Sequence, residues 1–335
     1  MAEANPSMMR PVTPPLPTGT LVPQHQVAGH AFGKGKTKLG LLQLSTDGTL
    51  VKPFQSSERG QREVDFYAQV FDPQCTDPTL LGLQPLLPRF LGTWTTPQQP
   101  GVQYIKMEDV VNRFKNPCIL DVKIGRITYD PGATQEKITQ ELAKFPPLQK
   151  VRFQLTGMKV FDAVRETYLC VEKRYLRGLS EEGVLSKGLA VFLNNDMDVY
   201  QHVIPLLLRR LHMVLDWMLK QRKFVFYASS LLLVYEGAMC RCCRHSRENR
   251  TTTFTEGENV TWTDCAKHDG TCCDATVAHH VWECSKHHLG MEGETNDQYV
   301  DVRMIDFAHV FPSGDRDDNY IEGVESLVKY LNRLL

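Results

Sequence analysis

The segment PCILDVKIG, residues 117–125, places two opposite charges inside an otherwise apolar run. Side chains two residues apart on a β-strand point to the same face, so Asp121 and Lys123 are expected to share one face of a strand. Burying such a pair costs several kcal/mol unless good geometry or a ligand offsets the lost hydration. The segment therefore predicts a buried strand whose charged pair needs good geometry or a ligand to offset its lost hydration.

Working outward, the pattern divides the chain into five segments. Residues 1–22 are Pro-rich and are expected to form a disordered tail. Residues 23–112 alternate strand-like runs with one helical pattern around REVDFYAQVF, which is typical of a small sheet with a helix packed on it. Residues 113–237 and 299–335 mix strands and helices. The prediction is an α+β protein with one large domain or two lobes.

Residues 238–298 are polar and rich in Thr, Cys and His, and an apolar strand stands on either side of them. This predicts a hairpin with a long irregular insertion. The pairs Cys240/Cys243 and Cys284/His287 have spacings that suit zinc. No finger pattern links the two pairs, so an irregular insertion is favoured and zinc is the alternative.

Composition limits the classes of function. A net charge of −1, with 42% hydrophobic and 23% charged residues, is typical of a soluble globular protein and gives no overall case for nucleic-acid binding. The chain has neither a signal-peptide core nor an apolar run long enough to span a membrane. We therefore expect a cytosolic or nuclear protein with reduced cysteines.

Two features of the first half suggest nucleotide binding. The segment GKGKTKLG (33–40) fails the P-loop pattern because His30 stands where the first Gly is needed, so a glycine-containing turn over a nucleotide is favoured. Lys52 on a strand, followed by Glu63 on the helical pattern, matches the pair that positions ATP phosphates in protein kinases. A solvated Lys on an edge strand is the alternative. YIKMEDV (104–110) fits either a hinge that contacts adenine or a plain linker.

The helical pattern at 133–144 has two faces. One carries charged and polar residues at helical spacing: Lys137, Gln140, Glu141 and Lys144. The other is an apolar stripe that is expected to pack inward: Ile138, Leu142 and Phe145. The polar face is either a solvated surface or, because it follows PCILDVKIG directly, a binding face for a multiply phosphorylated substrate.

MIDFAHV (304–310) ends an apolar strand with Asp306 and places His309 three residues later. A carboxylate there suits Mg²⁺, which proteins usually bind through one or two carboxylates together with phosphate oxygens. A turn-forming Asp is the other interpretation.

Taken together, these motifs resemble the inositol polyphosphate kinases. PCILDVKIG matches the family signature P-x-x-x-D-x-K-x-G, and SSLLLVYEG and MIDFAHVF match its two later signatures in the expected order. QVAGHAFGK, REVDFY and YDPGATQEK are most similar to the multikinase branch. The resemblance covers residues 24–237 and 299–333.

The resemblance implies a two-lobed fold related to protein kinases, with ATP in the cleft between the lobes. It implies that Lys52 binds ATP phosphates, that Glu108 and Val110 hold adenine through backbone contacts, and that Asp121 contacts the ribose. It places Mg²⁺ on Asp306, and Lys123 between the substrate hydroxyl and the transferring phosphoryl group. The inositol phosphate site would be lined by Arg59, Lys137, Gln140, Lys144, Lys173 and His309.

The short segment between Gly125 and Gly157 leaves no room for the large helical insert of the trisphosphate 3-kinases. This implies an open site that accepts several inositol phosphates and lipid headgroups. Glu141 and Lys173 stand where the family usually has glutamines. An acid there would repel phosphates unless it points away, and a lysine would strengthen binding.

The expected activity is therefore Mg²⁺-dependent and ATP-dependent phosphorylation of inositol 1,4,5-trisphosphate and tetrakisphosphates, at the 6- and 3-hydroxyls, toward the pentakisphosphate. We expect a monomer found in nucleus and cytoplasm. The alternatives are a phosphoinositide (PIP2) 3-kinase and a non-catalytic signalling scaffold. The scaffold is disfavoured because the four residues that carry the chemistry are all present: Lys52, Asp121, Lys123 and Asp306.

Overall fold

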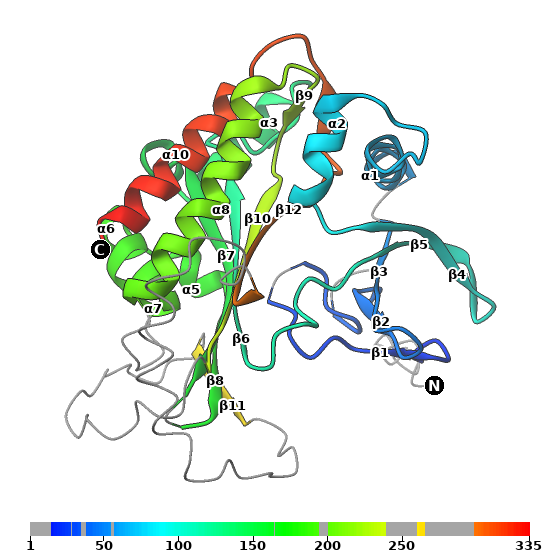
Figure 1. The fold of residues 1–335 in the computed structure, drawn as a ribbon, viewed down its shortest axis with the longest axis horizontal. Coiled ribbons are helices and arrows are strands. Elements are labelled where there is room, and N and C mark those ends of the chain that lie inside the picture. The colour runs from blue at the N-terminus through cyan, green and yellow to red at the C-terminus, as the bar shows by residue number, and fades with distance from the viewer. Residues whose placement is uncertain are drawn as a thin grey trace, which may run out of the picture.

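The computed structural model describes residues 15–27, 29–34, 38–54, 57–163, 165–193, 200–238, 260–264 and 298–335. Within them, two separate antiparallel sheets form the cores of two lobes (Figure 1). The smaller sheet is built from the first third of the chain, and the larger sheet from the remainder. The α+β, two-lobed architecture predicted for the chain is confirmed.

The N-terminal sheet has five strands in the order β1-β2-β3-β5-β4. The strands are β1 (Thr20–Leu21), β2 (Leu42–Leu44), β3 (Leu50–Pro53), β4 (Phe90–Thr96) and β5 (Gln99–Met107). The β1 strand lies inside the segment expected to be a disordered tail, so the folded part of this lobe begins before residue 23. Helices α1 (Ser57–Val70) and α2 (Pro78–Leu83) connect β3 to β4.

The larger sheet has six strands in the order β11-β8-β7-β6-β10-β12. They are β6 (Pro117–Ile124), β7 (Phe153–Asp162), β8 (Thr167–Val171), β10 (Ser230–Glu236), β11 (Val260–Asp264) and β12 (Val300–Ile305). β10 pairs antiparallel with β12, which confirms the hairpin predicted around the insertion. The insertion itself contributes β11, which pairs with β8 at the edge of the sheet. Two further short strands, β9 (Phe224–Phe226) and β13 (Val310–Pro312), pair with each other.

Helices cover one face of the larger sheet (Figure 1). The two long helices, α8 and α10, pack against each other, and between them they contact β6, β7 and β12. A π-helical turn, Val184–Leu189, lies between α6 and α7. The helices of this lobe are α3 (Gln135–Ala143), α4 (Leu148–Val151), α5 (Lys173–Arg177), α6 (Glu181–Gly183), α7 (Ala190–Leu193), α8 (Tyr200–Lys220) and α10 (Asp318–Asn332).

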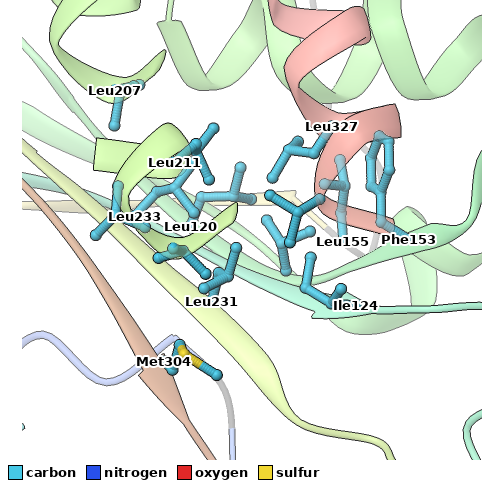
Figure 2. Close-up of a cluster of buried hydrophobic side chains, with 14 of the residues drawn as sticks. Leu120, Ile124, Phe153, Leu155, Leu207, Leu211, Leu231, Leu233, Met304 and Leu327 are labelled. Atoms are coloured by element: carbon cyan, nitrogen blue, oxygen red, sulfur yellow. The ribbon is translucent and has the colours of Figure 1, made fainter. Parts of the chain in front are cut away.

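The main hydrophobic core lies between that helical layer and the sheet. Leu120 and Ile124 of β6 point into it beside Leu231 and Leu233 of β10, and Leu211 of α8 packs on them from above (Figure 2). Alternate β6 residues enter the core because a strand exposes its side chains to opposite faces in turn. The intervening positions, including Asp121 and Lys123, therefore face the other side of the sheet.

The same core extends into the smaller lobe through α1. The ring of Phe66 lies 4.6 Å from that of Phe307, and the ring of Tyr67 lies 5.3 Å from it, measured between centroids. Phe307 is the second residue after β12, and Asp306 stands between the strand and this ring. The aromatic cluster therefore fixes α1 against the chain segment that carries Asp306.

The prediction that Leu142 packs inward is wrong. Helix α3 contains no buried residue, Leu142 is 37% exposed, and only Phe145, just beyond the helix, is buried. Ile138 is half-buried and Leu142 is exposed, so the short apolar stripe is only partly covered. An amphipathic pattern over so few residues does not fix which face is covered.

A core substitution tests this packing. We expect Leu211→Ala to lower the free energy of unfolding by about 2–5 kcal/mol, because it removes a fully buried side chain and leaves a cavity. Urea unfolding measures the loss. Met213→Ala on the same helix is the control, because Met213 is 39% exposed and its truncation should change stability by less than about 0.5 kcal/mol. Equal losses for the two variants would contradict the described core.

Candidate active site

The polar face of β6 lies opposite the main core. Cys118, Leu120, Val122 and Ile124 belong to that core, whereas Ile119 belongs to a separate small cluster. Asp121 and Lys123 follow Ile119 on the same face; Asp121 is 4% exposed and Lys123 is half-buried. The two charges therefore share a buried face, as their spacing predicts.

Hydrogen bonds from two hydroxyl groups offset the lost hydration of the buried Asp121 carboxylate. Thr156 Oγ1 donates to Asp121 Oδ1 at 2.6 Å, and the Ser230 hydroxyl on β10 also binds this carboxylate. Thr156 reaches it because a β-bulge adds one residue to β7, between the partners of Asp121 and Val122. Burial, and then the negative charge of Asp306, raise the pKa of Asp121 above its usual value against these hydrogen bonds. Sequence reasoning missed Thr156 and Ser230, since neither the bulge nor the strand register has a local signal.

Lys123, in contrast to Asp121, has no hydrogen-bond partner among the described residues. Within the described part of the chain it makes no hydrogen bond or ion pair, although its side chain is half-buried and its charge acts on both Asp121 and Asp306. A partly desolvated ammonium group without a partner is costly unless a ligand neutralises it. Lys123 is therefore placed to bind an anion.

Lys52 joins the two lobes through an ion-pair network. Its ammonium group on β3 lies 2.8 Å from Glu63 Oε1 on α1 and 2.6 Å from Asp306 Oδ1. The same Glu63 oxygen accepts a hydrogen bond from the Phe307 backbone N–H at 3.2 Å. Burial acts to lower the pKa of Lys52, but the two carboxylates raise it above its usual value. The predicted pairing of Lys52 with Glu63 is confirmed.

Asp306 has the donor chemistry that a hard cation requires. It directly follows β12 in a left-handed conformation (φ 65°), which Asp tolerates better than most residues, and its carbonyl accepts from Ser229 Oγ at 2.9 Å. Burial acts to raise the pKa of Asp306, but Lys52 lowers it below the usual value. Its side chain is 41% exposed, and among described residues only Oδ1 has a protein partner. An ionised, accessible carboxylate oxygen fits Mg²⁺.

A group of basic side chains shares the electrostatic environment of Lys123. Partial burial and the positive charges of Lys123 and Arg177 lower the pKa of Lys173, and Lys144 at the end of α3 adds to this effect. The Nε of Arg177 is buried without a hydrogen-bond partner among the described residues. Arg177 was not predicted from sequence, although it lies four residues after Lys173 on α5 and so shares its helical face. These charges are arranged to receive a multiply charged anion.

His309 is fixed by a residue that sequence reasoning also missed. Its Nδ1 lies 2.5 Å from Asp130 Oδ1, in the loop before α3. Partial burial lowers the pKa of His309, and Arg59 and Lys123 add to this effect against the opposing charge of Asp130. The neutral ring is therefore favoured near pH 7. Arg59 lies on α1 with an exposed side chain, so the structure brings it and His309 to the same region as Lys123.

The polar face of α3 is held together by its acid. Glu141 Oε1 accepts hydrogen bonds from Lys137 Nζ at 2.7 Å and from Lys144 Nζ at 2.6 Å. The acid therefore does not turn away from the lysines. Gln140 donates from Nε2 to Glu136 Oε1 at 3.2 Å, and its side chain is exposed.

The segment after β5 offers backbone groups beside an apolar surface. The Glu108 N–H donates to the Arg89 carbonyl at 2.9 Å, whereas Val110 makes no backbone hydrogen bond within the described residues. A small cluster of apolar side chains lies next to this segment: Val111, Phe114, Ile119 and Val234, with Val27 and Leu232 packed against it. Apolar side chains with a few free polar groups are typical of small-molecule sites.

Some predicted features fall outside the described residues. These are Gly35, Lys36 and Thr37 of the glycine-containing turn, and both pairs with zinc spacing: Cys240, Cys243, Cys284 and His287. Where residues are described, His, Cys, Asp and Glu form no group of three that could hold a metal. The described helices include none with the length and apolar character needed to cross a membrane.

Comparison with known proteins adds to this geometry. A family model described as "Inositol polyphosphate kinase" matches residues 104–332. The inositol polyphosphate multikinases of Rattus norvegicus and Mus musculus are 32% and 33% identical to this chain, and each match covers 96% of it and 95% of the relative. Inositol hexakisphosphate kinase 1 of Homo sapiens is 29% identical over 69% of this chain and 52% of the relative.

Solved structures support the fold. The inositol phosphate multikinase of S. cerevisiae, crystallised with ADP and Mn²⁺, aligns with a TM-score of 0.56 and 22% identity, over 85% of this chain and 98% of the other. A second multikinase structure aligns with a TM-score of 0.54 and 19% identity, over 82% of this chain and 99% of the other. At these identities the likeness concerns the fold alone. From the family match and the full-length relatives, the chain belongs to the inositol polyphosphate kinase family.

Proposed function

We propose that the protein is an ATP-dependent inositol polyphosphate multikinase. It phosphorylates inositol 1,4,5-trisphosphate and tetrakisphosphates toward the pentakisphosphate. The names of the full-length relatives support this class of substrate, and the ADP in the yeast relative supports ATP as the phosphoryl donor. The choice of the 6- and 3-hydroxyls follows from the family resemblance.

The observation that carries the proposal is the ammonium group of Lys123, which is half-buried and makes no hydrogen bond or ion pair among the described residues. It shares the polar face of β6 with Asp121, and its charge acts on Asp306 of the Lys52–Asp306 pair that links the lobes. Phosphoryl transfer depends mainly on positioning and charge neutralisation. Lys52 and Lys123 are placed to neutralise phosphate oxygens from two sides, which is what this chemistry requires.

The nucleotide would lie between the lobes. Lys52 binds its phosphates, and Asp121, held by Thr156 and Ser230, accepts hydrogen bonds from the ribose. Adenine contacts the backbone of Glu108 and Val110 and rests on the neighbouring apolar cluster.

Asp306 is the residue that would hold Mg²⁺. When bound, a divalent cation neutralises the phosphate oxygens that carry the developing charge. The Mn²⁺ in the yeast relative supports a divalent cation in this fold. In the free protein, the Lys52 contact keeps the Asp306 carboxylate ionised and therefore ready to bind a cation.

The inositol phosphate would occupy the basic region beyond Lys123. The charge of Lys123 acts on Lys173, as do the charges of Arg177 and Lys144, and Lys137 extends the region along α3. Gln140 and Arg59 border it from α3 and α1. Asp130 holds Nδ1 of His309, which favours a proton on that nitrogen and leaves Nε2 as an acceptor for an inositol hydroxyl.

Substitution of Lys137 tests whether the inositol phosphate and ATP bind at separate sites. We expect Lys137→Ala to raise the KM for inositol 1,4,5-trisphosphate about tenfold, because one charge-assisted contact to phosphate is lost, and to leave the KM for ATP nearly unchanged. Steady-state kinetics with each substrate varied in turn measure both constants. Lys150→Ala is the control, since Lys150 is 77% exposed and pairs with Glu181. Equal losses for both substrates would contradict the assignment of α3 to the inositol phosphate.

A substrate panel tests the proposed function. The protein is incubated with Mg-ATP and separately with inositol tris- and tetrakisphosphates and with PIP2 in vesicles, and NMR identifies the products. We expect phosphorylated inositol phosphates. Turnover of PIP2 alone would favour the lipid kinase, and no turnover on the whole panel would favour the scaffold.

A further inference from the structure

The polar face of α3 carries a carboxylate where the proposed function needs positive charge. Lys137 and Lys144 both donate to the same oxygen, Glu141 Oε1, at 2.7 and 2.6 Å. The lysine side chains are 48% and 40% exposed, whereas that of Glu141 is 14% exposed. The acid therefore lies beneath two accessible ammonium groups and holds them side by side.

These ion pairs contribute little to the fold. Helix α3 has no buried residue, and ion pairs at this spacing on a helix surface add only slightly to stability. The position of the pairs is more informative than their energy. Lys144 acts electrostatically on Lys173, which in turn lies beside Lys123. Glu141 thus lies at the edge of the same positive field that would receive the substrate.

The two lysines favour the charged form of Glu141 in the free protein. Burial acts to raise the pKa of Glu141, but the hydrogen bonds from Lys137 and Lys144 lower it below the usual value. A phosphate monoester carries a charge of about −1.5 to −2 near pH 7. Any phosphate that approaches the two lysines must therefore share them with an ionised carboxylate or displace it.

We propose that Glu141 is a built-in competitor of substrate phosphate and thereby determines specificity among inositol phosphates. Coulomb repulsion from its carboxylate grows with the charge of the ligand, so Glu141 weakens binding most for the most highly phosphorylated ligand. Glu141 therefore penalises trisphosphate substrates least and lowers the affinity for pentakisphosphate products most. This inference rests on the proposed function, because it assigns the α3 face to the inositol phosphate.

Binding measurements on Glu141→Gln test the proposal without requiring turnover. Isothermal titration without ATP compares inositol 1,4,5-trisphosphate with an inositol pentakisphosphate. We expect the variant to bind the trisphosphate about three- to tenfold more tightly and the pentakisphosphate with a larger gain. Raising the ionic strength should reduce both gains, because salt screens charges at a partly exposed site. In kinetic assays, inhibition by the pentakisphosphate should become stronger.

Glu136→Gln is the matched control. It removes the same charge from the same helix, and its amide oxygen can still accept the hydrogen bond from Gln140. We expect it to change neither affinity by more than about twofold, because Glu136 is exposed and pairs with no lysine among the described residues.

The outcomes separate this inference from the proposed function. Unchanged or weaker binding in Glu141→Gln, or an equal gain for both ligands, overturns the competitor role even if the unmodified protein turns over its substrates. Graded tightening in a protein that phosphorylates nothing on the panel supports the competitor role and overturns the proposed kinase activity. Absence of binding by both forms overturns both.

Discussion

The Lys123→Ala variant should fold normally and lose phosphoryl transfer to inositol phosphates by about 10³-fold. The loss is expected because Lys123 is the half-buried ammonium group whose charge acts on both Asp121 and Asp306. The fold should persist because its removal leaves no orphaned partner among the described residues. The measurement is kcat in the NMR-based turnover assay, together with thermal unfolding.

Two comparisons make this result interpretable. Lys106→Ala removes a lysine on β5 that pairs with Asp47, and it should keep near-normal turnover. Lys123→Arg keeps the charge but not the compact ammonium geometry, so partial activity would distinguish charge from positioning. Near-normal turnover by Lys123→Ala would show that Lys123 takes no part in phosphoryl transfer.

The Asp306→Asn variant should lose turnover by a comparable factor, about 10²–10⁴-fold, since the amide cannot neutralise a divalent cation. The left-handed conformation at this position suits Asn at least as well as Asp, so the backbone should be unaffected. Lys52 keeps its contact with Glu63. Activity measured against Mg²⁺ concentration shows whether the requirement for metal has increased.

Asp315→Asn, at an exposed position shortly after β13, is the control for the loss of one negative charge. It should change neither turnover nor Mg²⁺ dependence. If Asp306→Asn showed wild-type activity at low Mg²⁺, the metal would have to be held elsewhere.

The parts of the site that lie within single segments could be predicted from sequence. Alternation along β6 placed Asp121 and Lys123 on one face, and the strand Lys and helix Glu predicted the contact between Lys52 and Glu63. In each case the spacing within regular structure, or a known pairing of elements, determines the geometry.

The parts that depend on tertiary structure could not be predicted. Thr156 reaches Asp121 through a bulge, and Asp130 reaches His309 across a large distance in sequence. Strands β1 and β11 lie in Pro-rich and polar segments, where a neighbouring strand rather than local propensity stabilises the extended chain. Leu142 shows the opposite failure, because it belongs to an apolar pattern and yet its side chain is exposed.

A crystal structure with Mg²⁺, a non-hydrolysable ATP analogue and inositol 1,4,5-trisphosphate would test the central claim most directly. We expect the metal on the Asp306 carboxylate, Lys52 on the phosphates, and Lys123 within hydrogen-bond distance of the γ-phosphate analogue. The trisphosphate should contact Lys173 and the α3 face. A nucleotide bound away from Lys52, or a trisphosphate bound away from Lys123, would contradict the proposed site.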